Sequence, residues 1–227
     1  FIGASSGWYA SLYSKQLLIA HLPMILAARL HSALQIGLGS ASTLDALATH
    51  PGLERIDCVE INPAVVRGSR LFEESAVYRD PRVRVVLEDA VHWLVRGGAP
   101  YDLIVSDGKQ NEDFSGNAKL LSRDFYALVR SRMSPQGLFV QWISLGYLNS
   151  DFRTILRTIS GVFPELAVFL DPPNSVILVA AFEPLEDRPR MSREAFEAGR
   201  IARDLRRFEI PSREHLLRRW MADREPV

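Results

Sequence analysis

The chain has 227 residues, 47% of them hydrophobic, which is enough to bury the core of one domain, alone or with an appendage. Its 27 Lys and Arg residues equal its 27 Asp and Glu residues, so no excess of positive charge indicates a nucleic-acid partner. A single cysteine, Cys58, excludes an internal disulfide framework, and the longest apolar stretch, residues 17–30, is too short to span a bilayer.

The chain begins at Phe1 without a methionine and runs at once into Gly- and Ser-rich sequence. We therefore expect it to be a fragment of a longer protein. Residues 1–14 are expected to be irregular, and residues 15–29 to form a helix interrupted at Pro23, which lacks the amide hydrogen that a continuous helix needs.

Five alternations of strand and helix follow. The strand segments are almost continuously apolar, as expected of strands that are covered on both faces. We predict strands over residues 33–37, 55–60, 83–87, 102–106 and 138–143. We predict helices over residues 42–49, 63–72, 90–96, 123–133 and 150–163. Segments with Pro and Gly separate these elements, at residues 50–52, 80–81, 97–98 and 134–137.

Two further strands, over residues 165–170 and 175–181, are predicted to form a hairpin. A hairpin after five alternating units predicts an α/β fold with a doubly wound, mostly parallel, seven-stranded Rossmann-like sheet that has one antiparallel edge strand.

The sequence becomes Arg- and Glu-rich from residue 183. Residues 192–207 and 212–222 are predicted to be amphipathic helices, which we interpret as a solvated tail docked on the domain, with a partner-binding helix as the alternative. The predicted organisation is therefore an N-terminal segment and helix (1–30), a nucleoside-binding catalytic domain (31–182) and a helical tail (183–227).

Glycines Gly37 and Gly39 lie between the first predicted strand and the next helix, and Glu60 ends the second strand. Glycines let the backbone turn tightly and approach a ligand, and a carboxylate can accept two hydrogen bonds from ribose hydroxyls. A strand, a glycine turn, a helix and an acid at the tip of the second strand together predict a nucleoside-binding unit.

Two more acids follow strands, Asp89 after the third and Asp107 after the fourth. Either alone is equally well interpreted as a helix cap. Ligands of open α/β sheets bind at the carboxyl ends of the strands, so these acids are expected to line one edge with the glycine turn. Asp89 can accept a hydrogen bond from an adenine amino group. The pattern fits an S-adenosylmethionine-type nucleoside better than NAD.

Several motifs occur in an order that is hard to obtain by chance. They are Lys-Gln-Leu-Leu…Leu-Pro at 15–23, Gly-Leu-Gly-Ser-Ala-Ser at 37–42, Val-Glu-Ile-Asn-Pro at 59–63, Asp-Pro-Arg-Val…Glu-Asp-Ala at 80–90 and Tyr-Asp-Leu-Ile-Val-Ser-Asp-Gly at 101–108. With Phe-Tyr at 125–126 and Phe-Val-Gln-Trp at 139–142, they resemble the catalytic domain of spermidine synthase-like polyamine aminopropyltransferases, which has the class I S-adenosylmethionine-dependent methyltransferase type of fold.

The resemblance is closer still to the spermidine synthase-like domains fused to bacterial multi-helix membrane segments, which carry Ser-Gly-Asn-Ala-type loops as at 115–118. It implies a cytoplasmic location, with a membrane segment in the full-length protein. Spermidine synthases commonly form dimers or tetramers, so it also implies a homodimer. Their amino-terminal β domain is absent from this chain, which supports the interpretation as a fragment.

The resemblance implies aminopropyl transfer from decarboxylated S-adenosylmethionine to a small amine, with methylthioadenosine as the product. An ammonium is not a nucleophile, so Asp107 is the candidate base that takes a proton and holds the amine in line with the sulfonium carbon. The motif matches imply donor contacts by Gln16, Gly37, Gly39, Ser40, Glu60, Ile61, Asp89 and Ala90, and acceptor contacts by Lys109, Gln110, Asp113 and Gln141.

Two acids of the family pattern are absent. The turn aspartate that would bind the donor's amino group is Ser40, and the second acid of the Asp-Ser-x-Asp signature is Gln110. Glu112 and Asp113 follow in a loop about two residues longer than usual and can substitute. Each lost carboxylate removes a charge-assisted hydrogen bond of about 1.5–3 kcal/mol to a polycation.

The three lysines of the chain, Lys15, Lys109 and Lys119, all fall in segments expected to border the pocket. They indicate a pocket that is less acidic than a polyamine requires, although a lysine in a loop is often simply solvated. A donor that keeps its carboxylate, as in a methyltransferase, is therefore one alternative. A nucleoside-binding module of a membrane protein that has lost turnover is another.

Other chemistries have little support in the sequence. The five histidines have no ligand spacing and Cys58 has no partner pattern, so no metal site is predicted. Trp93 and Trp142 are interpreted as core residues rather than as platforms for a base.

Overall fold

The computed structural model describes residues 6–27, 29–107, 118–146, 149–171, 175–185, 191–197, 199–206 and 210–222. Within these ranges no helix combines the length and the apolar character that crossing a membrane would need.

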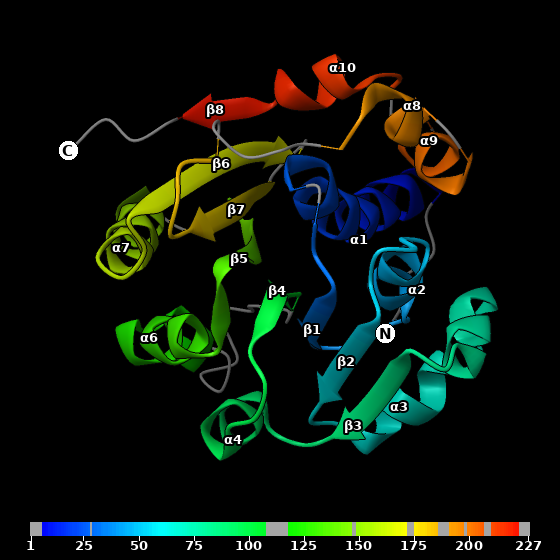
Figure 1. Cartoon of the computed structure of the whole chain (residues 1–227), viewed down its shortest axis with the longest axis horizontal. Coiled ribbons are helices and arrows are strands. Elements are labelled where there is room, and N and C mark those ends of the chain that lie inside the picture. Colours follow the sequence, from blue (N-terminus) through cyan, green and yellow to red (C-terminus); the bar gives the residue numbers. More distant parts are fainter. Residues whose placement is uncertain are drawn as a thin grey trace.

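One twisted sheet organises the molecule, in the order β3-β2-β1-β4-β5-β7-β6-β8 (Figure 1). The first five strands pair in parallel, and β7 is antiparallel to both β5 and β6. The predicted doubly wound, mostly parallel sheet is confirmed, and a short eighth strand is added beside β6. The strands are β1 (Ser32–Ile36), β2 (Arg55–Glu60), β3 (Val83–Leu87), β4 (Tyr101–Ser106), β5 (Met133–Ser144), β6 (Glu165–Asp171), β7 (Ser175–Ala181) and β8 (Trp220–Ala222).

Helices cover both faces of the sheet, as Figure 1 shows. One apolar core lies under α1 and α2, and the other lies under α4, α6 and α7. Consecutive side chains of β1 point to opposite faces of the sheet, so Ala33 belongs to the first core and Leu34 to the second. The helices are α1 (Ser6–Leu26), α2 (Ser42–Ala48), α3 (Pro63–Ser69), α4 (Ala90–Arg96), α6 (Arg123–Ser131), α7 (Asn149–Ser160), α8 (Arg193–Glu197), α9 (Gly199–Arg206) and α10 (Arg213–Leu217), with 3-10 turns η1 (Glu73–Arg79) and η2 (Lys119–Leu121).

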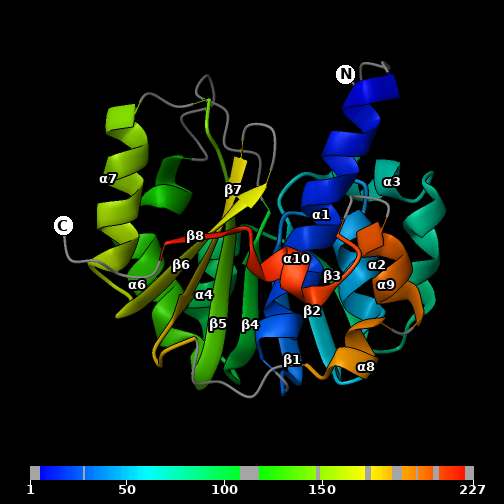
Figure 2. The same ribbon diagram turned by 90° about the horizontal axis from the view of Figure 1, so that it is seen from above.

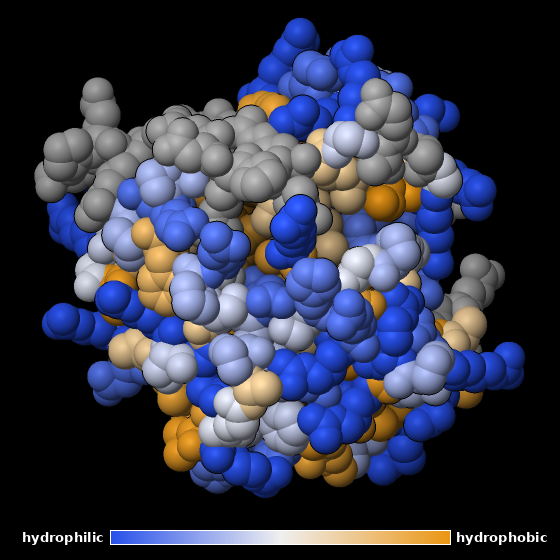
Figure 3. Space-filling view, viewed as in Figure 1, coloured by the Kyte–Doolittle hydropathy of each residue, from blue (hydrophilic) through white to orange (hydrophobic). Residues whose placement is uncertain are grey.

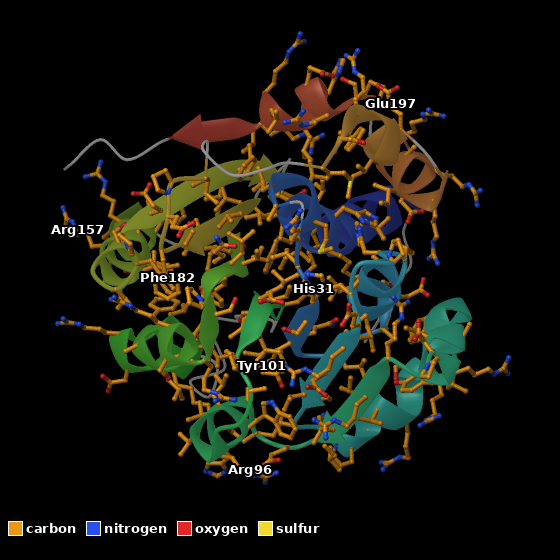
Figure 4. All side chains as sticks on the ribbon, in the orientation of Figure 1. His31, Arg96, Tyr101, Arg157, Phe182 and Glu197 are labelled. Carbon is orange, nitrogen blue, oxygen red and sulfur yellow. The ribbon has the colours of Figure 1, made fainter. Side chains whose placement is uncertain are left out.

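The outer surface is mainly polar on the face seen in Figure 3, where hydrophobic residues are scattered. Charged side chains such as Arg157 and Glu197 project from the margins, whereas Tyr101 lies inside, between the sheet and α4 (Figure 4). The Tyr101 hydroxyl donates to Asp57 Oδ2 at 2.7 Å, and burial with this bond raises the pKa of Tyr101 to about 12.

Helix α1 differs from its prediction in two ways. It begins at Ser6, inside the segment predicted to be irregular, and it continues through Pro23 to Leu26. A proline inside a helix removes one backbone hydrogen bond. Here the side chains around it, including Ile19, Leu22 and Ile25, are completely buried, and this packing holds the helix together across the missing bond.

The predicted break at residues 134–137 is present as a bulge within β5. Tyr101 pairs with Met133 but Leu103 pairs with Leu138, so four residues of β5 lie opposite one residue of β4. A Cβ at Gly137 would lie 3.0 Å from the Ser134 carbonyl oxygen, so a side chain at this position would crowd the backbone of the bulge.

The tail packs across the sheet margin and against α1, as seen in Figure 2. Its buried apolar side chains, Phe196, Ile201, Leu205 and Leu216, belong to the same core as α1. Residues 212–222 were predicted to be one helix, but the helix ends at Leu217 and β8 follows. The reason is that the Leu170 amide of β6 donates to the Arg219 carbonyl at 2.8 Å and draws the chain into the sheet.

A buried polar network joins the tail to α1. His21 Nδ1 lies 2.8 Å from His50 Nε2, and His21 Nε2 lies 3.4 Å from Asp204 Oδ2 on α9. Burial, and then the neighbouring His21, lowers the pKa of His50 from 6.5 to about 3. The folded protein therefore keeps His50 neutral at a pH where the unfolded chain would protonate it.

This difference predicts a loss of stability in mild acid. Because the unfolded state binds the proton near pH 6.5 and the folded state only near pH 3, the His50 contribution is complete above pH 6.5 and decreases as the pH falls. Between pH 7 and pH 5 it should lower the free energy of unfolding by about 2 kcal/mol. Urea unfolding of the wild type and of His50→Gln checks this, and equal pH slopes for the two proteins would contradict it.

Candidate active site

A cavity of about 580 Å³ opens at the carboxyl ends of the parallel strands. It lies where β1 is flanked by β2 and β4, the position at which the strand order reverses. Eight residues predicted from the sequence to form the site line it together: Gln16, Gly37, Gly39, Glu60, Ile61, Asp89, Ala90 and Asp107.

The glycine turn after β1 forms one wall. Gly37 and Gly39 have φ values of 88° and 55°, which glycine adopts without strain. No atom lies within 4 Å of where a Cβ on Gly39 would be, so the backbone is open to a ligand at this point. The Gln35 amide fixes the turn from below by donating to the Gly37 carbonyl at 2.7 Å.

Glu60 connects this turn to the end of β2. Its Oε2 accepts from the Leu38 amide at 2.9 Å and its Oε1 accepts from the Asn62 amide at 2.8 Å. The residue is 8% exposed, and each carboxylate oxygen keeps a second lone pair for the cavity. Glu60 therefore positions both turns and still has acceptor capacity for a ligand.

Asp89 acts both as a helix cap and as a wall of the cavity. Its Oδ1 accepts from the Val91 and His92 amides at the start of α4, and its Oδ2 accepts from Lys119 Nζ at 2.7 Å. Burial acts to raise the pKa of Asp89, but the Lys119 bond and the two amides outweigh it and hold that pKa below its usual value.

Asp107 follows β4 and faces the opposite end of the cavity. Its side chain is 8% exposed, and Oδ2 accepts from the Thr43 hydroxyl at 2.8 Å. Its Oδ1 has no hydrogen-bond partner within the described part of the chain, although Lys15 Nζ lies 3.7 Å away. A buried carboxylate oxygen without a donor can accept one from a substrate.

Lys15 completes this end of the cavity and lies on the ring of Trp142, which is outside the cavity wall. Lys15 was expected to border the pocket and does, and its Nζ lies 3.8 Å from the centroid of the Trp142 ring. Trp142 was interpreted as a core residue and does pack against the core that α1 covers, and its ring face also holds this cation. No local pattern in β5 distinguishes these two roles, because the partner comes from α1.

The other predicted site residues lie elsewhere. Ser40 is outside the cavity wall and its Oγ lies 2.8 Å from Ser42 Oγ. Gln141 is fully buried beneath the cavity, where its Oε1 accepts from the Tyr126 hydroxyl and its Nε2 donates to the Leu120 carbonyl. Lys109, Gln110 and Asp113 lie outside the described residues.

A metal site would need several ligand side chains close together. In the ranges that the structure describes, His, Cys, Asp and Glu side chains do not gather in a group of three or more that could hold an ion. The cavity instead offers a glycine turn, carboxylates and an apolar wall, which together are suited to a nucleoside-bearing organic ligand.

The fold defines an α/β protein of the Rossmann-like type, with a candidate ligand cavity where the strand order reverses. The family model of the spermine/spermidine synthase domain matches residues 12–172, and the chain belongs to this family.

Named relatives agree with this assignment. A polyamine aminopropyltransferase of Desulforudis audaxviator is 27% identical over 150 residues, which cover 65% of this chain and 54% of that protein. Another from Aeropyrum pernix is 29% identical over 153 residues, 65% of this chain and 49% of that protein. The chain thus spans about half the length of these relatives.

Solved structures share the fold. A spermidine synthase in complex with the transition-state analogue AdoDATO superposes with a TM-score of 0.71 at 22% identity, covering 78% of this chain and 64% of that chain. Human methyltransferase-like protein 13 in complex with SAH has a TM-score of 0.60 at 20% identity, covering 99% and 96%.

The Thr43–Asp107 hydrogen bond should contribute measurably to stability. Thr43→Val keeps the shape of a side chain that is 1% exposed but removes the donor to a buried carboxylate. We expect it to lower the free energy of unfolding by about 1–3 kcal/mol in urea denaturation. Thr43→Ser keeps the hydroxyl and is the matched control, so an equal loss in both variants would assign the effect to packing.

Proposed function

We propose that this chain transfers an aminopropyl group from decarboxylated S-adenosylmethionine to a small amine acceptor, as in polyamine biosynthesis. The observation that carries this proposal is a single cavity in which a glycine turn and three strand-end acids, Glu60, Asp89 and Asp107, meet in a chain of the spermine/spermidine synthase family.

The nucleoside end of the donor fits the wall formed by β1, β2 and β3. The free lone pairs of Glu60 can accept from the two ribose hydroxyls, beside the open backbone of Gly39. Ile61 is 64% exposed and lines the cavity, so it presents an apolar surface to the adenine ring. Asp89 stands beside it, and an adenine amino group would share its Oδ2 with Lys119.

Asp107 then carries the chemistry at the other end. It holds the acceptor nitrogen and takes a proton from it, so that the nitrogen lone pair attacks the aminopropyl carbon bonded to the sulfonium. A nitrogen–carbon bond forms while the carbon–sulfur bond breaks, and its electron pair neutralises the sulfur as methylthioadenosine leaves. The proton passes from Asp107 to solvent, and Thr43 keeps the carboxylate in place throughout.

The remaining partners follow from the family. Lys109, Gln110 and Asp113 are proposed to contact the acceptor, with Gln141 supporting them from below. We also propose that the protein acts as a homodimer on the cytoplasmic side, linked to a membrane segment in the full-length protein.

Asp107→Asn tests the catalytic assignment. The amide keeps the size of the side chain but cannot take the proton, so methylthioadenosine release with propylamine or 1,4-diaminobutane as acceptor should fall by about 10²–10⁴-fold. Calorimetric affinity for methylthioadenosine should be retained. Asp124→Asn makes the same change at an exposed position of α6 and should leave turnover unchanged. Full turnover by Asp107→Asn would remove Asp107 from the mechanism.

Glu60→Ala tests the nucleoside site. It removes the acceptor of two backbone amides and of the ribose, and affinity for methylthioadenosine should fall by about 10- to 100-fold in calorimetry. Glu54→Ala, an exposed acid outside the cavity, is the control. Unchanged affinity in Glu60→Ala would mean that nucleosides do not bind at this turn.

The same titrations on the wild type distinguish the donors. Tighter binding of decarboxylated S-adenosylmethionine than of S-adenosylmethionine supports aminopropyl transfer. The reverse preference would favour a transferase that uses the carboxylated donor.

A further inference from the structure

The acceptor end of the cavity already contains an ammonium group of the protein. Lys15 reaches in from α1 with only 7% of its surface exposed. Its Nζ lies 3.7 Å from Asp107 Oδ1 and 3.8 Å from the centroid of the Trp142 ring. Lysine is almost never buried without partners, so this carboxylate and this ring face account for its inward position.

Asp171, at the end of β6, provides a third wall. It is 2% exposed, and its Oδ2 accepts from the Ser175 hydroxyl at 2.7 Å. Burial raises the pKa of Asp171, while the Ser175 hydroxyl, the charge of Arg219, the Trp142 side chain and the charge of Lys15 act to lower it. Lys15 therefore lies beside one buried carboxylate, Asp107, and its charge also acts on a second, Asp171.

These three side chains, Asp107, Trp142 and Asp171, form what we call the ammonium cage. A buried carboxylate oxygen without a donor, Asp107 Oδ1, and an aromatic face are groups that bind an alkylammonium, and the buried Asp171 adds negative charge behind Trp142. All three lie at the carboxyl ends of β4, β5 and β6, on the face of the sheet that α1 covers, with β7 between β5 and β6. The cage adjoins the cavity, whose wall includes both Lys15 and Asp107.

We propose that Lys15, by filling the ammonium cage, makes the acceptor end of the site discriminate against acceptors that carry a second ammonium. This inference rests on the proposed function, because Asp107 identifies the acceptor end. A monoamine can approach Asp107 beside Lys15 and lose one proton to this carboxylate, which leaves no second charge beside Lys15. A diamine brings a further positive charge to a position where one is already fixed, and like charges at this distance repel.

Chemical rescue tests the cage without any donor. Lys15→Ala deletes Cγ, Cδ, Cε and Nζ, which are the heavy atoms of propylamine. The melting temperature of this variant should rise by about 3–6 °C at a propylamine concentration tenfold above Kd, relative to equal ionic strength of NaCl. The wild type and Lys119→Ala, which loses the other described lysine of the cavity from an exposed ion pair, should not respond beyond the NaCl control. 1-Propanol has the size without the charge and should not stabilise Lys15→Ala.

A folded Lys15→Ala that gains no more from propylamine than the wild type would overturn the cage. Leaving Asp107 buried without its cation can prevent folding. Lys15→Ala/Asp107→Asn has less unpaired charge and controls for this. If the double variant folds, while Lys15→Ala refolds neither in NaCl nor in propylamine, the proposal also fails. Refolding in propylamine alone supports it.

The preference of the site for monoamines is measured by comparing two acceptors. With the donor present, the wild type should have a higher kcat/KM for propylamine than for 1,4-diaminobutane. Lys15→Gln should reverse this preference, and the ratio of the two kcat/KM values should change by about tenfold, the factor that corresponds to one charge-assisted contact. An unchanged order would overturn the role of Lys15. Absence of methylthioadenosine binding would instead count against the proposed function, since the rescue by propylamine needs no nucleoside.

Discussion

The parallel pairing of β1 with both β2 and β4 is the constraint on which the site depends. It fixes Ile36 opposite Val59 on one side and opposite Ser106 on the other, so that three strands end at the same level. The chain then leaves β1 through the glycine turn, and helices depart to opposite faces of the sheet. A cavity between these exits is a consequence of topology, and the side chains at the strand ends decide what it binds.

Those strand-end acids serve the structure and the cavity at once. Glu60 holds two turns, Asp89 caps α4, and Asp107 bonds to α2 through Thr43. The two interpretations of such acids, helix cap or ligand contact, are therefore compatible in this protein. The structural bonds also orient each carboxylate before any ligand arrives, which lowers the entropy lost on binding.

The sequence predicts the sheet and most of the cavity because both depend on local patterns. Apolar runs mark the strands, and an acid directly after a run must lie at the sheet edge. It does not predict the pairing of Lys15 with Trp142, since the position of α1 over β5 is set by packing between segments more than a hundred residues apart. The continuation of α1 through Pro23 has the same origin, because buried neighbours outweigh a local preference. Ser40 and Gln141 occupy family motif positions, yet neither lines the cavity, because a motif position does not determine whether a side chain reaches it.

The short strand β8 has a consequence for handling the protein. Without residues 219–222, β6 would present a row of unpaired backbone amides and carbonyls along its outer side. Exposed strand edges of this kind recruit other chains and promote aggregation. The C-terminal tail thus protects this sheet from edge-to-edge association, and fragments prepared for biochemistry should extend at least through Ala222.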